Sequence, residues 1–179
     1  MLSKSAGNEA NKLQAVKAYS GSREEKAKLF ALLKSVDSEF FPPLSDGRFE
    51  RIGNAKDLEE YLDRLAEGEI LYIEEKNRAI GLIGYFVKFR KYGCAFIENI
   101  SVAKKSRKKG HGTTLLRECL GRLSGQGAAK TLVRTWSTNA ASIALYNKFG
   151  FTLEKAIKDD RAKGVHTLHF EKKLGGQAE

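Results

Sequence analysis

The sequence has few cysteines and no long apolar run, and each absence excludes a class of protein. Its two cysteines, Cys94 and Cys119, are too few for a disulfide framework in 179 residues, and they lack the spacing of a metal site. No stretch approaches the roughly 20 apolar residues of a membrane span, and the first residues, MLSKSAGNEANKLQAV, contain no apolar run long enough for a signal peptide. We therefore expect a cytoplasmic protein with reduced, buried cysteines and no membrane partner.

Acidic residues are also scarce relative to basic ones. The chain has 22 Asp and Glu against 32 Lys and Arg, which gives a formal net charge of +10. Such an excess favours an anionic partner. On charge alone, nucleic acid, an anionic cofactor and simple solubility all remain open.

The rest of the composition is that of a globular protein. Hydrophobic residues make up 41% before the 17 glycines are counted, which excludes a disordered chain. The length suits one domain with a real core, and there is no internal repeat or linker. We expect a single domain over residues 12–174, with disordered tails at 1–11 and 175–179.

Two helical patterns lie in the first third of the chain. The first follows Ser22, which is predicted to form a capping box with Glu25, and its buried face is predicted to be Leu29, Phe30, Leu33 and Val36. The second is predicted to be capped by Asn54 and to stop at Gly68. Its buried stripe is predicted to be Leu58, Tyr61, Leu62 and Leu65. The two prolines of segment 37–47 predict a loop between these helices.

Strands and two further helices account for the remainder. Strands are predicted at 12–19, in a hairpin over 69–90, at 94–102, at 130–136, and as a closing pair over 151–157 and 164–174. A helix over 112–125 buries Leu115, Leu116, Cys119, Leu120 and Leu123, and another covers 139–150. This order predicts a mixed α/β fold with helices on both faces of one sheet.

The stretch 104–112, KKSRKKGHG, joins the strand 94–102 to the helix at 112. Its glycines allow the backbone to approach a ligand closely, and the first turn of a helix presents unpaired N–H groups that bind anions. Neither common phosphate-loop signature fits, since Gly-Lys-Ser/Thr is missing and position 115 is Leu. A phosphate cradle and a solvated basic loop both remain open at this point.

A second motif follows about thirty residues later. Residues 107–112 read Arg-x-x-Gly-x-Gly, and residues 139–151 read NAASIALYNKFGF. This pair of motifs, in this order after a strand, resembles the GNAT superfamily of N-acetyltransferases, closely over 94–157 and in outline over 13–93. The resemblance implies a mixed, mostly antiparallel sheet of six to seven strands flanked by about four helices. It also implies transfer of an acetyl group from acetyl-CoA to a primary amine by direct attack in a ternary complex.

The same resemblance implies a cofactor site. The pyrophosphate of acetyl-CoA would lie on the backbone N–H groups of 107–113, and the pantetheine arm would pair with a strand edge exposed where the sheet splays. The implied cofactor-binding residues are Ile100, Ser101, Val102, Arg107, Lys108, Lys109, Gly110, His111, Gly112, Thr113, Asn139 and Tyr146.

Glu98 and Tyr146 are the candidate catalytic residues. Strand alternation places Glu98 on one face with Cys94, Phe96, Ile100 and Val102. A single carboxylate on an apolar face would have a raised pKa, which suits a general base. Alternatively, Glu98 pairs with a lysine or caps a bulge. The resemblance makes Tyr146 the acid that protonates the thiolate, whereas helix packing is its alternative role.

The acceptor is less well defined. The resemblance places the segment between the first two helices beside the acceptor, so Phe40 and Phe41 are candidate acceptor-binding residues. Trp136 is a third candidate because it ends a strand near the predicted cleft, although ordinary packing explains all three equally well. We expect a small-molecule or peptide amine and a monomer or homodimer. A non-catalytic acyl-CoA-binding module and a basic RNA-associated protein are the alternatives. The concentration of charge in 104–109 argues against nucleic acid.

Overall fold

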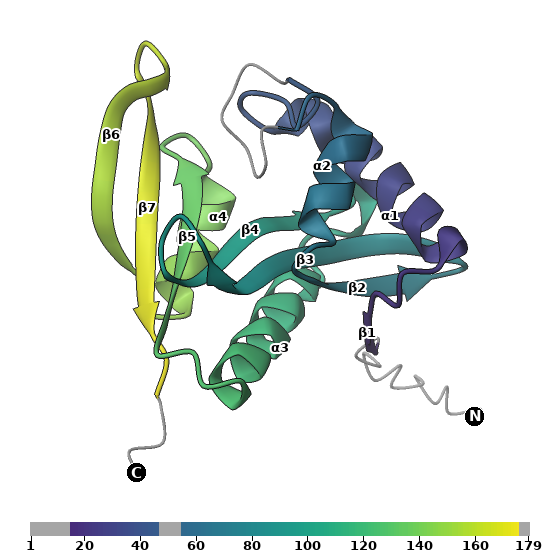
Figure 1. Ribbon diagram of the computed structural model, residues 1–179. Helices are drawn as coiled ribbons and strands as arrows, with labels where there is room; N and C mark the ends of the chain where they lie inside the picture. The colour runs from purple at the N-terminus through teal and green to yellow at the C-terminus, as the bar shows by residue number, and fades with distance from the viewer. Residues whose placement is uncertain (1–14, 47–54, 176–179) are drawn as a thin grey trace, which may run out of the picture.

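One seven-stranded sheet forms the centre of the protein. The computed structural model describes residues 15–46 and 55–175, and Figure 1 shows their arrangement. In this part of the chain the strand order is β1-β2-β3-β4-β5-β7-β6, and only β4 and β5 are parallel neighbours. The strands are β1 (Val16–Ala18), β2 (Glu69–Glu75), β3 (Arg78–Phe89), β4 (Cys94–Val102), β5 (Lys130–Trp136), β6 (Thr152–Ala162) and β7 (Val165–Lys173). The predicted mixed, mostly antiparallel sheet is confirmed. The predicted tails lie outside the described residues, apart from Gly175.

Helices cover both faces of the sheet, as predicted. In Figure 1, α1 and α2 lie on one side of the β2-β3-β4 layer and α3 lies on the other. The helices are α1 (Arg23–Val36), α2 (Leu58–Leu65), α3 (His111–Gly125) and α4 (Ala140–Lys148), with short 3-10 turns η1 (Asp37–Glu39) and η3 (Lys104–Ser106). Among the described residues, no helix is long and apolar enough to span a membrane.

Two hydrophobic clusters hold these layers together. Residues of α3 and α4 pack on one face with Ile83 and Val133, and residues of α1 and α2 pack on the other with Tyr72 and Leu82. The five predicted core residues of α3 are all buried. Each such leucine contributes about 1.5–3 kcal/mol when it leaves water, which is enough to fix the helix against β3 and β4.

The two N-terminal helices begin at side-chain caps. Ser22 caps α1 by accepting a hydrogen bond from the Glu25 N–H (3.2 Å). The Glu25 carboxylate accepts from the N–H and hydroxyl of Ser20, two residues before the cap. The cap of α2 is Asp57, which accepts from the Glu60 N–H (2.9 Å). The prediction of Asn54 as the cap was therefore wrong, and Asn54 itself lies outside the described residues.

The buried faces of these helices largely match the prediction. The predicted stripe of α2 is entirely buried. In α1, Leu32 is buried where Phe30 was expected, and Phe30 is only partly buried at the margin of the cluster. A face at positions 29, 32, 33 and 36 follows the 3.6-residue period more closely than one that includes position 30.

A β-bulge interrupts β4 at Glu98. Gly84 of β3 is opposite Asn99, but the next residue, Tyr85, is opposite Ile97, so Glu98 is the extra residue. The bulge reverses the alternation of side chains along the strand. Ile97 belongs to the cluster under α3 and Ile100 packs against it. The predicted single face containing both Phe96 and Ile100 was wrong for this reason.

The sheet divides between β4 and β5. These strands pair only from Ala95↔Thr131 to Ile97↔Val133. Beyond that point β4 continues along β3 to Val102, while β5 continues along β7 to Trp136. Figure 1 shows the β5-β7-β6 group running across the direction of β2, β3 and β4. The divergence, hereafter the fork, is the splay that the family resemblance implied.

Candidate active site

The fork exposes the backbone of β4 on its open edge. The Ala103 N–H donates to the Ile80 carbonyl of β3 (2.8 Å). Because successive residues of a strand point their backbone groups to opposite edges, Val102 and Ile100 point away from β3 and into the fork. The Val102 carbonyl accepts a hydrogen bond from the Arg107 Nε (2.9 Å), which agrees with this orientation. The backbone of Ile100 and Val102 therefore faces the fork, and the pairing of a ligand with it stays a prediction. Ser101 instead is buried and donates its hydroxyl to Asn99 (2.6 Å).

The N-terminus of α3 lies directly after this edge. The first helical bond of α3 runs from the Thr114 N–H to the Gly110 carbonyl (2.9 Å). The N–H groups of His111, Gly112 and Thr113 precede it and have no helical acceptor. Lys108 and Gly110 adopt left-handed backbone angles, with φ of 61° and 86°. These turns shape residues 107–113, hereafter the phosphate loop, into a row of N–H groups at the positive end of a helix dipole.

Three elements meet at Gly112. A Cβ atom at this position would lie 3.7 Å from Leu145 Cδ2 of α4 and 3.9 Å from Val102 Cγ2 of β4. The phosphate loop, the open edge of β4 and the helix that carries Tyr146 are thus in contact. The two sequence motifs, about thirty residues apart, therefore lie side by side in the structure.

The cations of this region differ in their surroundings. Lys104, Lys105, Lys108 and Lys109 are exposed. Arg107 binds the Val102 carbonyl through Nε, and its Nη1 lies 2.5 Å from Glu39 Oε2. Its guanidinium is therefore directed toward η1 and β4, which favours a phosphate-binding role for its backbone over one for its side chain.

Glu98 lies at the vertex of the fork. It is the first residue of β4 after the last β4–β5 pair, and Arg134 holds the same place in β5. Their side chains are 4% and 15% exposed, with Arg134 Nη2 at 3.3 Å from Glu98 Oε2. The expectation of a solitary carboxylate on an apolar face was wrong, because the neighbouring strand supplies a guanidinium. The carboxylate therefore has a cationic partner inside the fork.

Tyr146 and Asn139 occupy α4. Tyr146 is 2% exposed, and its ring lies 5.6 Å from that of Phe151 and 5.8 Å from that of Phe170. Burial raises the pKa of Tyr146 above its ordinary range, so the hydroxyl keeps its proton at neutral pH. Asn139 caps α4 by accepting from the Ser142 N–H (3.2 Å) and donates to Thr135 (3.1 Å).

The three candidate acceptor residues lie together across the fork. The rings of Phe40 and Trp136 are 5.8 Å apart. The Arg161 guanidinium of β6 lies 5.4 Å from the Trp136 ring centroid, and its Nη1 donates to the Phe41 carbonyl. Phe41 itself is 39% exposed. The segment after α1 therefore touches the end of β5 and the β6-β7 hairpin.

Arg134 and Arg161 were missed by the sequence reasoning. A signal for Arg134 was available, because a charged residue alternates with Thr131, Val133 and Thr135 in the middle of a central strand. No comparable signal marks Arg161. Its position depends on β6 extending to Ala162, well beyond the predicted end at 157. The two free cysteines differ in burial: Cys119 is buried as expected, but Cys94 is partly exposed, so the prediction that both are buried was wrong for Cys94.

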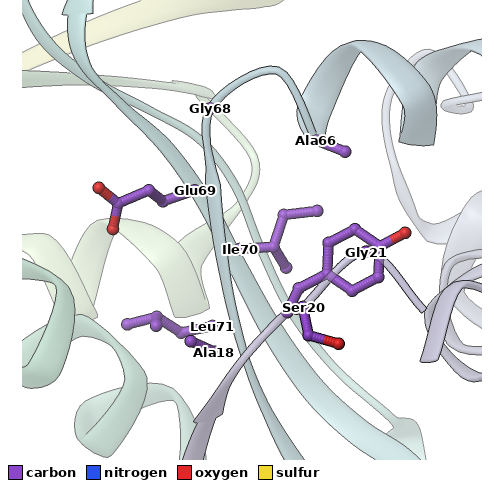
Figure 2. A pocket seen from close by; sticks show the side chains of 9 residues that line it. Ala18, Ser20, Gly21, Ala66, Gly68, Glu69, Ile70 and Leu71 are labelled. Atoms are coloured by element: carbon purple, nitrogen blue, oxygen red, sulfur yellow. The ribbon is translucent and has the colours of Figure 1, made fainter.

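A separate hollow lies at the junction of β1 and α1. Figure 2 shows its lining, which consists of Ala18, Tyr19, Ser20, Gly21, Ala66, Gly68, Glu69, Ile70 and Leu71. The Glu69 carboxylate already accepts from Tyr85 (2.6 Å) and Gln126 (2.8 Å). None of these lining residues belongs to the fork, and we assign no function to this hollow.

Comparison with known proteins agrees with this geometry. The sequence model of the Acetyltransferase (GNAT) family matches residues 29–151, more than half of the chain. A search of curated proteins gave no match.

Solved structures show the same fold. A ribosomal-protein-alanine N-acetyltransferase from Brucella melitensis is 23% identical with a TM-score of 0.67, over 89% of this chain and 99% of that one. An aminoglycoside 6′-N-acetyltransferase complexed with coenzyme A is 12% identical with a TM-score of 0.69, over 92% and 99%. A Bacillus anthracis protein in complex with acetyl coenzyme A is 22% identical with a TM-score of 0.53, over 60% and 62%.

Proposed function

Because the chain belongs to the GNAT acetyltransferase family, we propose that it transfers an acetyl group from acetyl-CoA to a primary amine within a ternary complex. The observation that carries the proposal is the fork beside the helix N-terminus. Pairing of β4 with β5 ends at Ile97↔Val133, and the phosphate loop follows the freed edge directly. An extended donor with a pyrophosphate at one end fits both features.

Different residues of the site bind different parts of acetyl-CoA. The N–H groups of the phosphate loop receive the pyrophosphate, and the backbone of Ile100 and Val102 pairs with the pantetheine amides. One N–H of this edge also stabilises the oxyanion that forms at the thioester carbonyl. The exposed lysines at 104, 105, 108 and 109 add long-range attraction for the phosphates.

Glu98 and Tyr146 accept and donate the protons that the reaction transfers. Glu98 accepts a proton from the acceptor ammonium, through water, and the free amine then forms the new C–N bond at the thioester carbon. As the C–S bond breaks, Tyr146 donates its proton to the thiolate, and the second proton that the nitrogen loses as it becomes an amide returns through water to the Tyr146 oxygen. Arg134 pairs with the Glu98 carboxylate. Burial raises the pKa of Tyr146, so the phenol retains the proton that it donates.

The acceptor enters on the side of the sheet that carries Trp136. Phe40, Phe41 and Trp136 form its apolar wall, and Arg161 borders the same surface. Two structurally similar proteins are named for their acceptors, ribosomal-protein alanine in one case and an aminoglycoside in the other. The test therefore includes both small-molecule amines and peptide N-termini. A cytoplasmic enzyme agrees with the two free cysteines.

The test combines acetyl-CoA with a panel of small-molecule and peptide amines and measures release of free thiol. The proposal expects amine-dependent thiol release with at least one acceptor class, with the product heavier by one acetyl group. Binding of acetyl-CoA without thiol release from any amine would indicate a non-catalytic binding module. Absence of binding would remove the cofactor assignment.

A further inference from the structure

A continuous chain of contacts joins the phosphate loop to the only tryptophan of the sequence. Arg107 pairs with Glu39 at 2.5 Å. The next residue, Phe40, places its ring 5.8 Å from that of Trp136. The donor side of the fork is thereby linked to the acceptor side through two contacts and one peptide bond.

Segment 37–46 spans the fork and is internally closed. The Asp37 carboxylate accepts from both the N–H (2.8 Å) and the hydroxyl (2.6 Å) of Ser45, which ties the two ends of the segment together. Arg107 holds one side of it through Glu39. Arg161 holds the other through the Phe41 carbonyl. A segment closed on itself and fixed to both arms of the fork can transmit a displacement from one arm to the other.

The phosphate loop has few bonds of its own to hold it. The Arg107 N–H bonds the Lys104 carbonyl at a long 3.4 Å, and the N–H groups at the start of α3 precede the first helical bond. An anion bound to these groups would fix the backbone of Arg107. The guanidinium, held between Val102 and Glu39, would then fix Glu39 as well.

We infer that the Glu39–Arg107 pair couples occupation of the phosphate loop to the position of segment 37–46, so that the donor nucleotide orders the acceptor wall. This inference rests on the proposed function. Both side chains are partly exposed, at 36% for Glu39 and 41% for Arg107, so solvent weakens the pair. A coupling of roughly 1.4- to 5-fold is the range for such pairs. By linkage, an acceptor that orders the wall strengthens nucleotide binding by the same factor.

The test uses 3′-phospho-ADP, the nucleotide part of coenzyme A without pantetheine. This probe occupies the phosphate loop and is too short to run along the open edge of β4 to Trp136. Calorimetry measures its affinity, and acrylamide quenching of tryptophan fluorescence measures the accessibility of Trp136. We expect 3′-phospho-ADP to lower the quenching constant of the native protein about twofold.

Glu39→Gln should abolish this protection while the affinity for 3′-phospho-ADP stays within about threefold of native. A merely structural role of Glu39 would change the quenching constant of the free protein but not its response to the nucleotide. Glu67→Gln is the matched control, because Glu67 forms a surface ion pair with Arg64 (2.8 Å) within the α2 region, and it should respond as the native protein does.

Each outcome decides the inference. Nucleotide binding without a change in quenching, or full protection in Glu39→Gln, would overturn the coupling and leave the proposed function intact. Failure of both 3′-phospho-ADP and acetyl-CoA to bind the native protein would overturn the cofactor assignment and the coupling together.

Discussion

Substitution of Tyr146 by Phe separates catalysis from folding because it removes one hydroxyl from a buried ring. The contacts with Phe151 and Phe170 remain, so the packing loss is small. Loss of one buried hydrogen-bonding group lowers the free energy of unfolding by about 0.5–1.5 kcal/mol. A domain stable by about 5–15 kcal/mol stays almost fully folded after such a loss.

The expected loss of activity is much larger. Removal of a general acid lowers kcat by about 100-fold, or about 2.7 kcal/mol in the barrier, with the affinity for acetyl-CoA nearly unchanged. Thiol release with the best acceptor measures kcat, and urea unfolding measures stability. Tyr72→Phe is the matched control, because Tyr72 is also buried and donates to Glu25 (2.8 Å) but lies in β2. It should lose similar stability and no activity. A Tyr146→Phe enzyme within about twofold of the native kcat would refute the acid role.

Four further changes test other parts of the structure. Gly110→Asp should abolish coenzyme A binding, whereas Gly127→Asp, at a comparable left-handed glycine (φ 78°) beyond the other end of α3, should leave it unchanged; equal affinity in both would remove the phosphate loop from the site. Glu98→Gln should lower kcat/KM most below pH ~10.4, where a lysine-like acceptor is protonated, and approach the native value above it; parallel profiles from about pH 6 to 10 would make Glu98 structural. Hydrogen bonds from Ser20 lower the pKa of Glu25 to about 2, so the stability that its carboxylate contributes is complete above pH 4.5 and is lost as the pH falls toward 2. Glu25→Gln should lower the free energy of unfolding at pH 7 and flatten its pH dependence, as measured by urea titrations. Gly84→Ala would place a Cβ 2.4 Å from the buried Leu65 Cδ1 and should cost about 1–3 kcal/mol, whereas Gly121→Ala, in open space within α3, should be neutral or stabilising by up to ~1 kcal/mol.

Local patterns predicted the elements that depend on local interactions. The bounds of β4 and β5 and the buried face of α3 agree with the prediction, since strand alternation and helical period are properties of consecutive residues. Motif spacing also indicated the turn at residues 107–113, because a glycine-rich turn before a helix is a local feature.

Contacts between distant segments could not be predicted in the same way. The Glu98–Arg134 pair depends on two strands that separate after Ile97↔Val133. The contact of Arg161 with Phe41 joins positions 120 apart in the sequence. Even the faces of β4 were predicted incorrectly, because the bulge at Glu98 arises from pairing with β3 and leaves no trace in the alternation of β4 itself.

The bulge at Glu98 decides which side chains of β4 face each layer of the protein. Upstream of it Ala95 and Ile97 face α3, and downstream Ile100 does, so odd and even positions exchange faces at this point. On the opposite face Asn99 donates to the Tyr61 hydroxyl of α2 (3.1 Å). If the same residues paired with β3 without the bulge, every position beyond Glu98 would change faces: Asn99 and Ser101 would enter the apolar layer under α3, and Ile100 would face α2. Deletion of residue 98 would instead join Ile97 directly to Asn99 and leave the remaining side chains on their present faces, so the one unpaired residue adds the Glu98 carboxylate at the fork without disturbing either layer of β4.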